Sequence, residues 1–145
     1  MALAAVVAPP VRRAAAWWLA IGVALVAGVL GVPGALVAAI GVTAVHCAHL
    51  RAQGHTLRGL PLQVRAVFLA LLVAGTWPAL AFVHVLQCGG ILGSVVFDYC
   101  VLARLLALAP WNRREPLSWP LVRWTLLAPP GPGSILARRL PAPDR

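Results

Sequence analysis

Asp98 is the residue whose type and setting most directly suggest chemistry, because it interrupts a long apolar run. We expect it inside a membrane-spanning helix, ~10 Å of helix rise from the outer end. A carboxylate at that depth costs at least ~2.5 kcal/mol on insertion scales, so it must be protonated, paired or in contact with water. Asp98 is therefore a candidate site for a proton or a cation. An interhelical hydrogen bond, or a contact within a larger complex, is the structural alternative.

Three further residues with polar or reactive side chains lie in apolar stretches near Asp98, namely Cys100, His84 and Arg104. With Asp98 they are candidates for a buried polar site that transports a proton, an ion or a soft, sulfur-containing solute. Arg104 follows Asp98 by six positions, so the two side chains point to different sides of a helix. We expect Arg104 near the cytoplasmic end, with its guanidinium reaching towards the membrane surface.

His46, Cys47 and His49 form a second candidate group, for a metal ion. Imidazole and thiolate are ligands of soft or borderline metals, and His46 and His49 share one face of a helix. A zinc site needs three or four converging ligands, so histidines bonded to loop carbonyls or lipid phosphates are the alternative. No cofactor is predicted, because His46 and His84 would lie near opposite faces of the membrane and cannot bind one haem.

The composition indicates where these residues must be held. Hydrophobic residues make up 61% of the 145 residues and charged residues only 10%, whereas roughly a quarter of a soluble domain is charged. The net charge of +9 comes from Arg, with no Lys. These arginines separate apolar runs, which favours anionic lipid headgroups over nucleic acid as the partner. Because no phosphate loop, G-x-S-x-G, H-E-x-x-H or acid pair is present, we predict no enzymatic activity.

The apolar runs predict an all-α fold, an integral membrane bundle of about four transmembrane helices over residues 1–110. A spanning helix needs ~20 mainly apolar residues. Turns are expected at residues 32–34 and 87–90, and Pro78 is expected to kink the third helix. The four predicted spans are Ala14–Val32, Ala35–Leu50, Ala66–Leu86 and Ile91–Ala109.

The arginines predict the orientation of this bundle. Basic residues precede the first span, occupy the loop 51–65 and recur in the tail, while both predicted turns are uncharged. With four spans every basic cluster falls on one side, and the positive-inside rule makes that side cytoplasmic. Both termini are then cytoplasmic. The alternative for the first run is a cleaved signal peptide, but it is long and lacks an A-x-A exit, so we expect an uncleaved helix.

Residues 111–145 predict a cytoplasmic tail rich in Trp, Arg and Pro. Ser118 suits a helix N-cap and Pro120 its first turn, so we expect a short interfacial helix near 118–128, followed by an extended segment from Pro129. Tryptophan favours the depth at which membrane meets water. The tryptophans expected as interfacial anchors are Trp17, Trp18, Trp111, Trp119 and Trp124.

Small residues at the start of the predicted fourth span suggest close helix packing. Gly89 and Gly93 are spaced i, i+4, as are Gly90 and Ser94. Such pairs let helices approach closely, either inside the bundle or against a second protein or a second copy. With no visible catalytic group, we predict an accessory or scaffold subunit of a membrane complex. The transport site and the metal site described above are the two alternatives.

The segment from Asp98 to Arg113 resembles the end of short bacterial inner-membrane hairpin domains associated with rhodanese sulfurtransferases. Cys100 corresponds to the cysteine of that family, and Pro110-Trp111-Asn112 to its closing motif. The resemblance implies a membrane-anchored role near sulfur or persulfide handling, with Cys100 as the carrier. With the predicted spans, the expected location is the bacterial inner membrane, as a multi-pass protein. The chain departs from the family at Asp98-Tyr99, in its two additional helices and in lacking a rhodanese domain.

Overall fold

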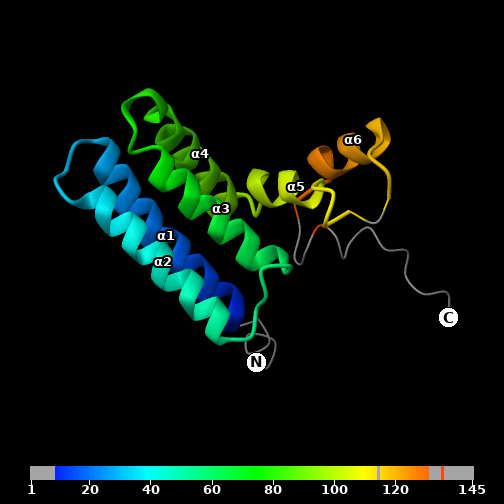
Figure 1. Cartoon of the computed structure of the whole chain (residues 1–145), viewed down its shortest axis with the longest axis horizontal. Helices are drawn as coiled ribbons and strands as arrows, with labels where there is room; N and C mark the ends of the chain where they lie inside the picture. The colour runs from blue at the N-terminus through cyan, green and yellow to red at the C-terminus, as the bar shows by residue number, and fades with distance from the viewer. Residues whose placement is uncertain (1–8, 114, 131–134, 136–145) are drawn as a thin grey trace, which may run out of the picture.

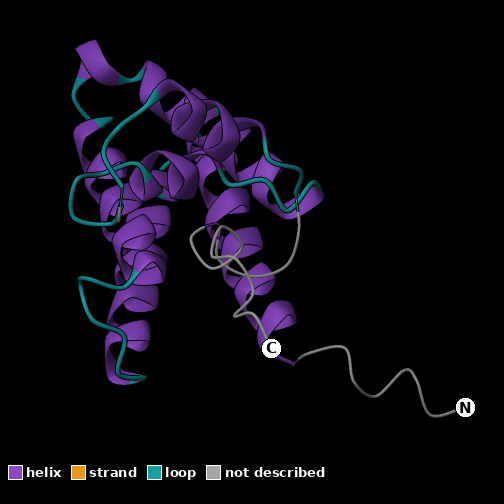
Figure 2. Cartoon of the chain, turned by 90° about the vertical axis from the view of Figure 1, so that its right-hand side faces the viewer, coloured by secondary structure: helices purple, strands orange, loops and turns teal. Residues whose placement is uncertain are grey.

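A computed structural model describes residues 9–113, 115–130 and 135, which form helices and loops and no strand (Figure 2). This confirms the all-α prediction at the level of fold class. The start of the chain, Arg114 and most of the predicted extended tail lie outside the described residues. The helices are α1 (Pro9–Val29), α2 (Ala35–Ala52), α3 (Leu60–Ala74), the 3₁₀ turn η1 (Pro78–Leu80), α4 (Phe82–Val96), α5 (Val101–Ala107) and α6 (Trp119–Leu127).

Helices α1 to α4 form an antiparallel bundle (Figure 1). Helix α1 packs against α2 and α4, and α3 packs against α2 and α4, so the four helices close a ring. We name the end with the connections 30–34 and 75–81 the turn end. The opposite end, with the start of α1 and the loop 53–59, is the basic end. Helix α5 leaves the bundle beside α3 and leads to α6.

The interior of the bundle contains an apolar cluster, which close approaches of the helices enclose. Gly31 and Gly34 have φ angles of +88° and +76°, which favour glycine and reverse the chain between α1 and α2. Gly22 allows α1 to approach α4 closely, since a Cβ at Gly22 would lie 3.1 Å from Ile91 Cγ2. The buried cluster that these contacts enclose consists of Ile21, Leu25, Ala39, Phe68, Leu72 and Ile91.

The predicted third span is wrong in its extent. Helix α3 begins six residues earlier, at Leu60, and ends at Ala74, and the chain reverses before α4 begins at Phe82. Pro78 causes this reversal rather than a kink. Trp77 has φ −73° and ψ 128°, the extended conformation that a residue before proline prefers. The predicted turn 87–90 lies inside α4, so Gly89 and Gly90 are accommodated within a helix.

The predicted fourth span is also wrong, because residues 97–100 separate α4 from α5. Asp98 lies in this break with φ +50°, a left-handed conformation that Asp tolerates better than most residues. Cys100 caps α5, its Sγ accepting a hydrogen bond from the backbone N–H of Ala103 at 3.4 Å. The first two predicted spans overlap α1 and α2, although α1 begins at Pro9 rather than Ala14. Helix α6 lies where a helix was predicted near 118–128, with Ser118 as its N-cap, and its interfacial location remains a prediction.

Two helical segments of the described chain are long and apolar enough to cross a membrane, namely Ala35–Ala52 and Pro78–Val96. Ala15–Val29 and Leu60–Ala74 are apolar but shorter. A bundle of four spans therefore remains a prediction.

Candidate functional site

A buried arginine joins three helices near the basic end. Arg65 of α3 is only 7% exposed, and its Nε donates a hydrogen bond to Nδ1 of His46 in α2, at 3.1 Å. Its guanidinium carbon lies 3.3 Å from the ring centroid of Trp18 in α1. A cation over a tryptophan face is attracted by the negative face of the ring. We name Trp17, Trp18, His46 and Arg65 the arginine cluster.

Aromatic stacking completes the arginine cluster. The rings of Trp17 and His46 stack at 4.7 Å with an interplanar angle of 11°, and Trp18 meets Phe68 edge-on at 5.2 Å. Because Nδ1 of His46 accepts from Arg65, the neutral imidazole carries its proton on Nε2. Trp17 and Trp18, predicted as interfacial anchors, therefore lie half-buried between helices.

The predicted metal ligands do not converge. His46 is engaged by Arg65 and Trp17, and Nε2 of His49 lies 3.0 Å from Nε2 of Gln53. Cys47 is a half-buried free thiol. Across residues 9–113, 115–130 and 135, no three side chains of His, Cys, Asp or Glu gather closely enough to hold a metal ion.

The residues predicted to form a transport site lie apart. Asp98 is exposed in the break after α4, and Cys100 caps α5. His84 is buried near the turn end, where its Nε2 contacts the carbonyl oxygen of Leu72 at 3.1 Å. Gly75 makes room for that imidazole, since a Cβ there would lie 2.5 Å from Nε2.

Arg104 is buried, with its guanidinium bound inside the protein, and the expectation that it reaches towards the membrane surface stays a prediction. Its Nη1 donates to the carbonyl oxygen of Thr125 at 2.8 Å, and its guanidinium lies 4.1 Å from the Tyr99 ring. The Tyr99 hydroxyl donates to the carbonyl oxygen of Leu126. Carbonyls in the last turn of a helix lack intrahelical partners, so α6 offers acceptors to both donors.

A polar group that sequence reasoning missed links α3 to the segment after α5. Gln63 and Asn112 form a reciprocal amide pair: Asn112 Nδ2 donates to Gln63 Oε1 at 2.6 Å, and Gln63 Nε2 donates to Asn112 Oδ1 at 3.2 Å. Trp111 Nε1 donates to the same Oε1 at 3.4 Å, and Asn112 also donates to the Leu106 carbonyl at 2.8 Å. The segment Pro110-Trp111-Asn112 predicted the end of a helix, but no feature of the sequence predicted its contact with Gln63.

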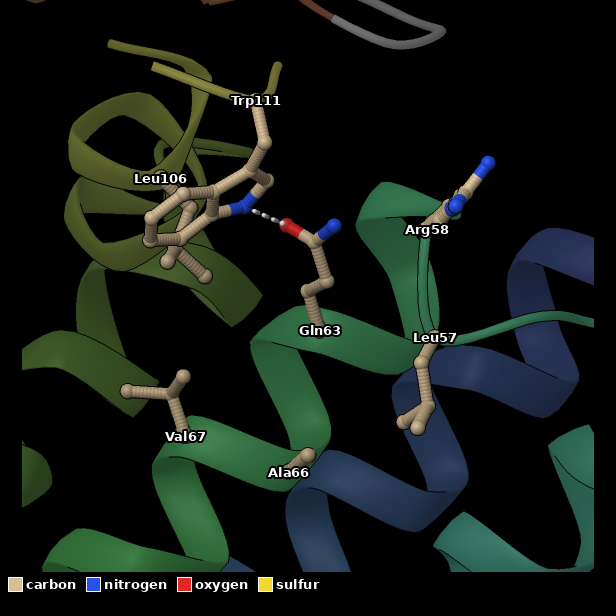
Figure 3. A pocket seen from close by; sticks show the side chains of 7 residues that line it. All are labelled: Leu57, Arg58, Gln63, Ala66, Val67, Leu106 and Trp111. Atoms are coloured by element: carbon tan, nitrogen blue, oxygen red, sulfur yellow. Dashed lines mark hydrogen bonds between the residues drawn. The ribbon is translucent and has the colours of Figure 1, made fainter. Parts of the chain in front are cut away.

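Gln63 borders a pocket of about 530 Å³ (Figure 3). Its apolar lining comes from Leu57, Ala66, Val67 and Leu106. Arg58, Gln63 and Trp111 supply its polar and aromatic lining, with the Trp111 indole N–H directed at Gln63.

Helix α4 carries an exposed apolar stripe, which we name the α4 stripe, formed by Val85, Gly89, Leu92 and Val96. The three large side chains are 59%, 62% and 59% exposed, and a Cβ at Gly89 would meet no described atom within 4 Å. Gly90 is equally open, and Ser94 donates to its carbonyl oxygen at 2.8 Å. By contrast, a Cβ at Gly93 would lie 3.2 Å from the Tyr99 carbonyl oxygen.

The remaining predicted anchors are more exposed. Trp111 and Trp119 are 72% and 75% exposed, and Trp124 is 37% exposed.

In comparisons with protein-family models, curated proteins and solved structures, no match to this chain was found.

Proposed function

We propose that the protein is a multi-pass membrane protein in which α1 to α4 cross the bilayer and hold a partner membrane protein. The exposed apolar surface of the bundle is the observation that carries the membrane location. Helices α1, α2 and α4 each expose several large aliphatic side chains and α3 exposes Val73, and residues 14–50 and 66–97 contain no charged residue. A helix that is apolar on all faces belongs in a large core or a membrane.

Charge supports an orientation with the basic end in the cytoplasm. Arg51 and Arg58 lie at this end and are exposed, whereas the connections at the turn end contain no charged residue. Positive residues beside short connections favour the cytoplasmic side. On this proposal the membrane is the bacterial inner membrane.

The α4 stripe supports the accessory role. Its members are spaced four, three and four residues apart, the spacing with which one helix meets another along a seam. Gly89 lies in the middle of the stripe and is open, while Gly22, Gly28 and Gly75 would each place a Cβ against side chains of the same chain. A small residue without a neighbour in its own chain leaves room for the backbone of a second helix.

Affinity purification of the tagged full chain in mild detergent, read by mass spectrometry, tests this role. We expect a stoichiometric membrane partner or a second copy, released by Gly89→Leu. Gly41→Leu is the matched comparison: Gly41 is equally open but lies on α2, so it tests whether the α4 stripe in particular holds the partner. A monomer without a partner, or equal effects of both substitutions, would contradict the proposal.

A further inference from the structure

We propose that the pocket beside Gln63 binds one anionic phospholipid, with an acyl chain along α3 and α5 and the phosphate at Arg58. The inference rests on the proposed membrane location, because a bilayer supplies this ligand. It names a binding site that the accessory role does not require.

The walls of the pocket fit an acyl chain. Ala66 and Val67 of α3, Leu106 of α5 and Leu57 of the preceding loop present hydrocarbon to a space of about 530 Å³. Leu57 is 63% exposed, so a bound chain would cover apolar surface that the fold leaves open. Burial of such surface is worth roughly 25 cal/mol per Å².

The charge of the pocket selects the headgroup. Arg58 lines the pocket, is exposed, and no acidic residue is among the lining side chains. A guanidinium can bind two phosphate oxygens with parallel hydrogen bonds. Because Arg58 belongs to the basic end, the phosphate would lie at the cytoplasmic surface and the chain would extend along the helices towards the bilayer interior.

The pocket is held open by its own hydrogen bonds. Gln63 is buried and binds both Asn112 and Trp111, and Asn112 is bonded in turn to the Leu106 carbonyl. These bonds fix the α3 wall and the Trp111 wall relative to each other without a ligand. A preformed site loses less conformational entropy on binding. Trp111 also places an indole at the depth where tryptophan is favoured.

Quenching of Trp111 by brominated lipids tests the site in the full chain reconstituted into vesicles. The Trp111 signal is the difference between wild type and Trp111→Phe, measured with brominated phosphatidylglycerol or brominated phosphatidylcholine as the titrated lipid. We expect brominated phosphatidylglycerol to reach half-maximal quenching at a lower mole fraction than brominated phosphatidylcholine. A basic residue near an anionic surface contributes enough to shift such an equilibrium about fivefold, so Arg58→Gln should reduce the preference about fivefold.

Two further variants decide between the pocket and a general surface charge. Arg51→Gln removes an exposed arginine at the same end but outside the pocket lining, and the preference should survive it. Ala66→Phe fills the apolar part and should abolish saturable quenching by both lipids. Equal losses from Arg51→Gln and Arg58→Gln, or no preference in wild type, would overturn the lipid site alone. Failure of wild type to float with either vesicle would overturn the membrane location and, with it, the site.

Discussion

Arg65 shows how a charged side chain is accommodated inside an apolar bundle without a carboxylate. Burying a charge is costly unless it is paired or hydrogen-bonded. Within the described part of the chain, Arg65 relies on His46 as acceptor and on the Trp18 face. The arginine cluster thereby joins α1, α2 and α3 through one side chain.

Replacing His46 with leucine should destabilise the bundle by about 1–3 kcal/mol, because the buried Nε–H of Arg65 loses its acceptor. His49→Leu is the control, since His49 is exposed and contacts Trp17, the tryptophan that also stacks on His46. We expect that change to stay within ~0.5 kcal/mol. Thermal unfolding in detergent measures both variants. If His46→Leu melts at the same temperature as wild type, the Arg65–His46 bond contributes nothing to stability.

Replacing the buried Gln87, unlike replacing His46, should cost little stability. Its Nε2 donates to the Phe68 carbonyl at 3.0 Å, but its buried Oε1 has no hydrogen-bond partner. Removing an unsatisfied acceptor offsets the loss of the single bond. Gln87→Met should therefore change the unfolding free energy by less than ~1 kcal/mol, with Gln63→Met, which breaks several bonds, as the destabilised comparison. A loss beyond ~2 kcal/mol on Gln87→Met would show that water or a ligand binds Oε1.

At the scale of elements, the reversal between α3 and α4 depends on the close approach of Gly75 and His84. Gly75 has φ −65°, which alanine adopts freely, so the obstacle to a side chain is steric, and the nearest atoms are those of the His84 imidazole. We expect Gly75→Ala to cost about 1–3 kcal/mol by overpacking. Gly41→Ala, in an open helical position, should instead stabilise α2 by roughly 0.5–1 kcal/mol. Chemical denaturation of both variants measures the difference, and effects of the same sign would contradict the geometry.

The elements also show which features the sequence could predict. Hydropathy and Val32-Pro33-Gly34 were sufficient for the first hairpin, and Ser118 with Pro120 were sufficient for α6. The second hairpin was misplaced because Pro78 and Gly89-Gly90 compete as helix breakers: the chain reverses around Pro78, and the two glycines stay within α4. Asp98 lies outside a helix because α4 ends at Val96 and residues 97–100 break the chain before α5. The Gln63–Asn112 pair was beyond prediction because it joins segments far apart in the chain.

At the scale of the whole molecule, α6 is attached to α5 through its last carbonyls. Arg104→Gln removes a charged donor to Thr125, a bond worth ~1.5–3 kcal/mol. We expect amide hydrogen exchange in α6 to accelerate at least about tenfold, while α1 to α4 remain unchanged. Arg123→Gln, on an exposed face of α6, should leave exchange as in wild type. Unchanged protection of α6 in Arg104→Gln would mean that other contacts hold it.

The short uncharged connections of the turn end have a consequence for biogenesis. On the proposed topology, each hairpin, α1 with α2 and α3 with α4, needs to translocate only its own connection across the bilayer. No charged side chain of these hairpins has to pass the hydrocarbon region, because residues 30–34 and 75–81 contain none. A nascent chain that has reached residue 59 therefore already holds a complete insertable unit. We expect the first hairpin to enter the membrane as one unit, and the second to assemble against it there.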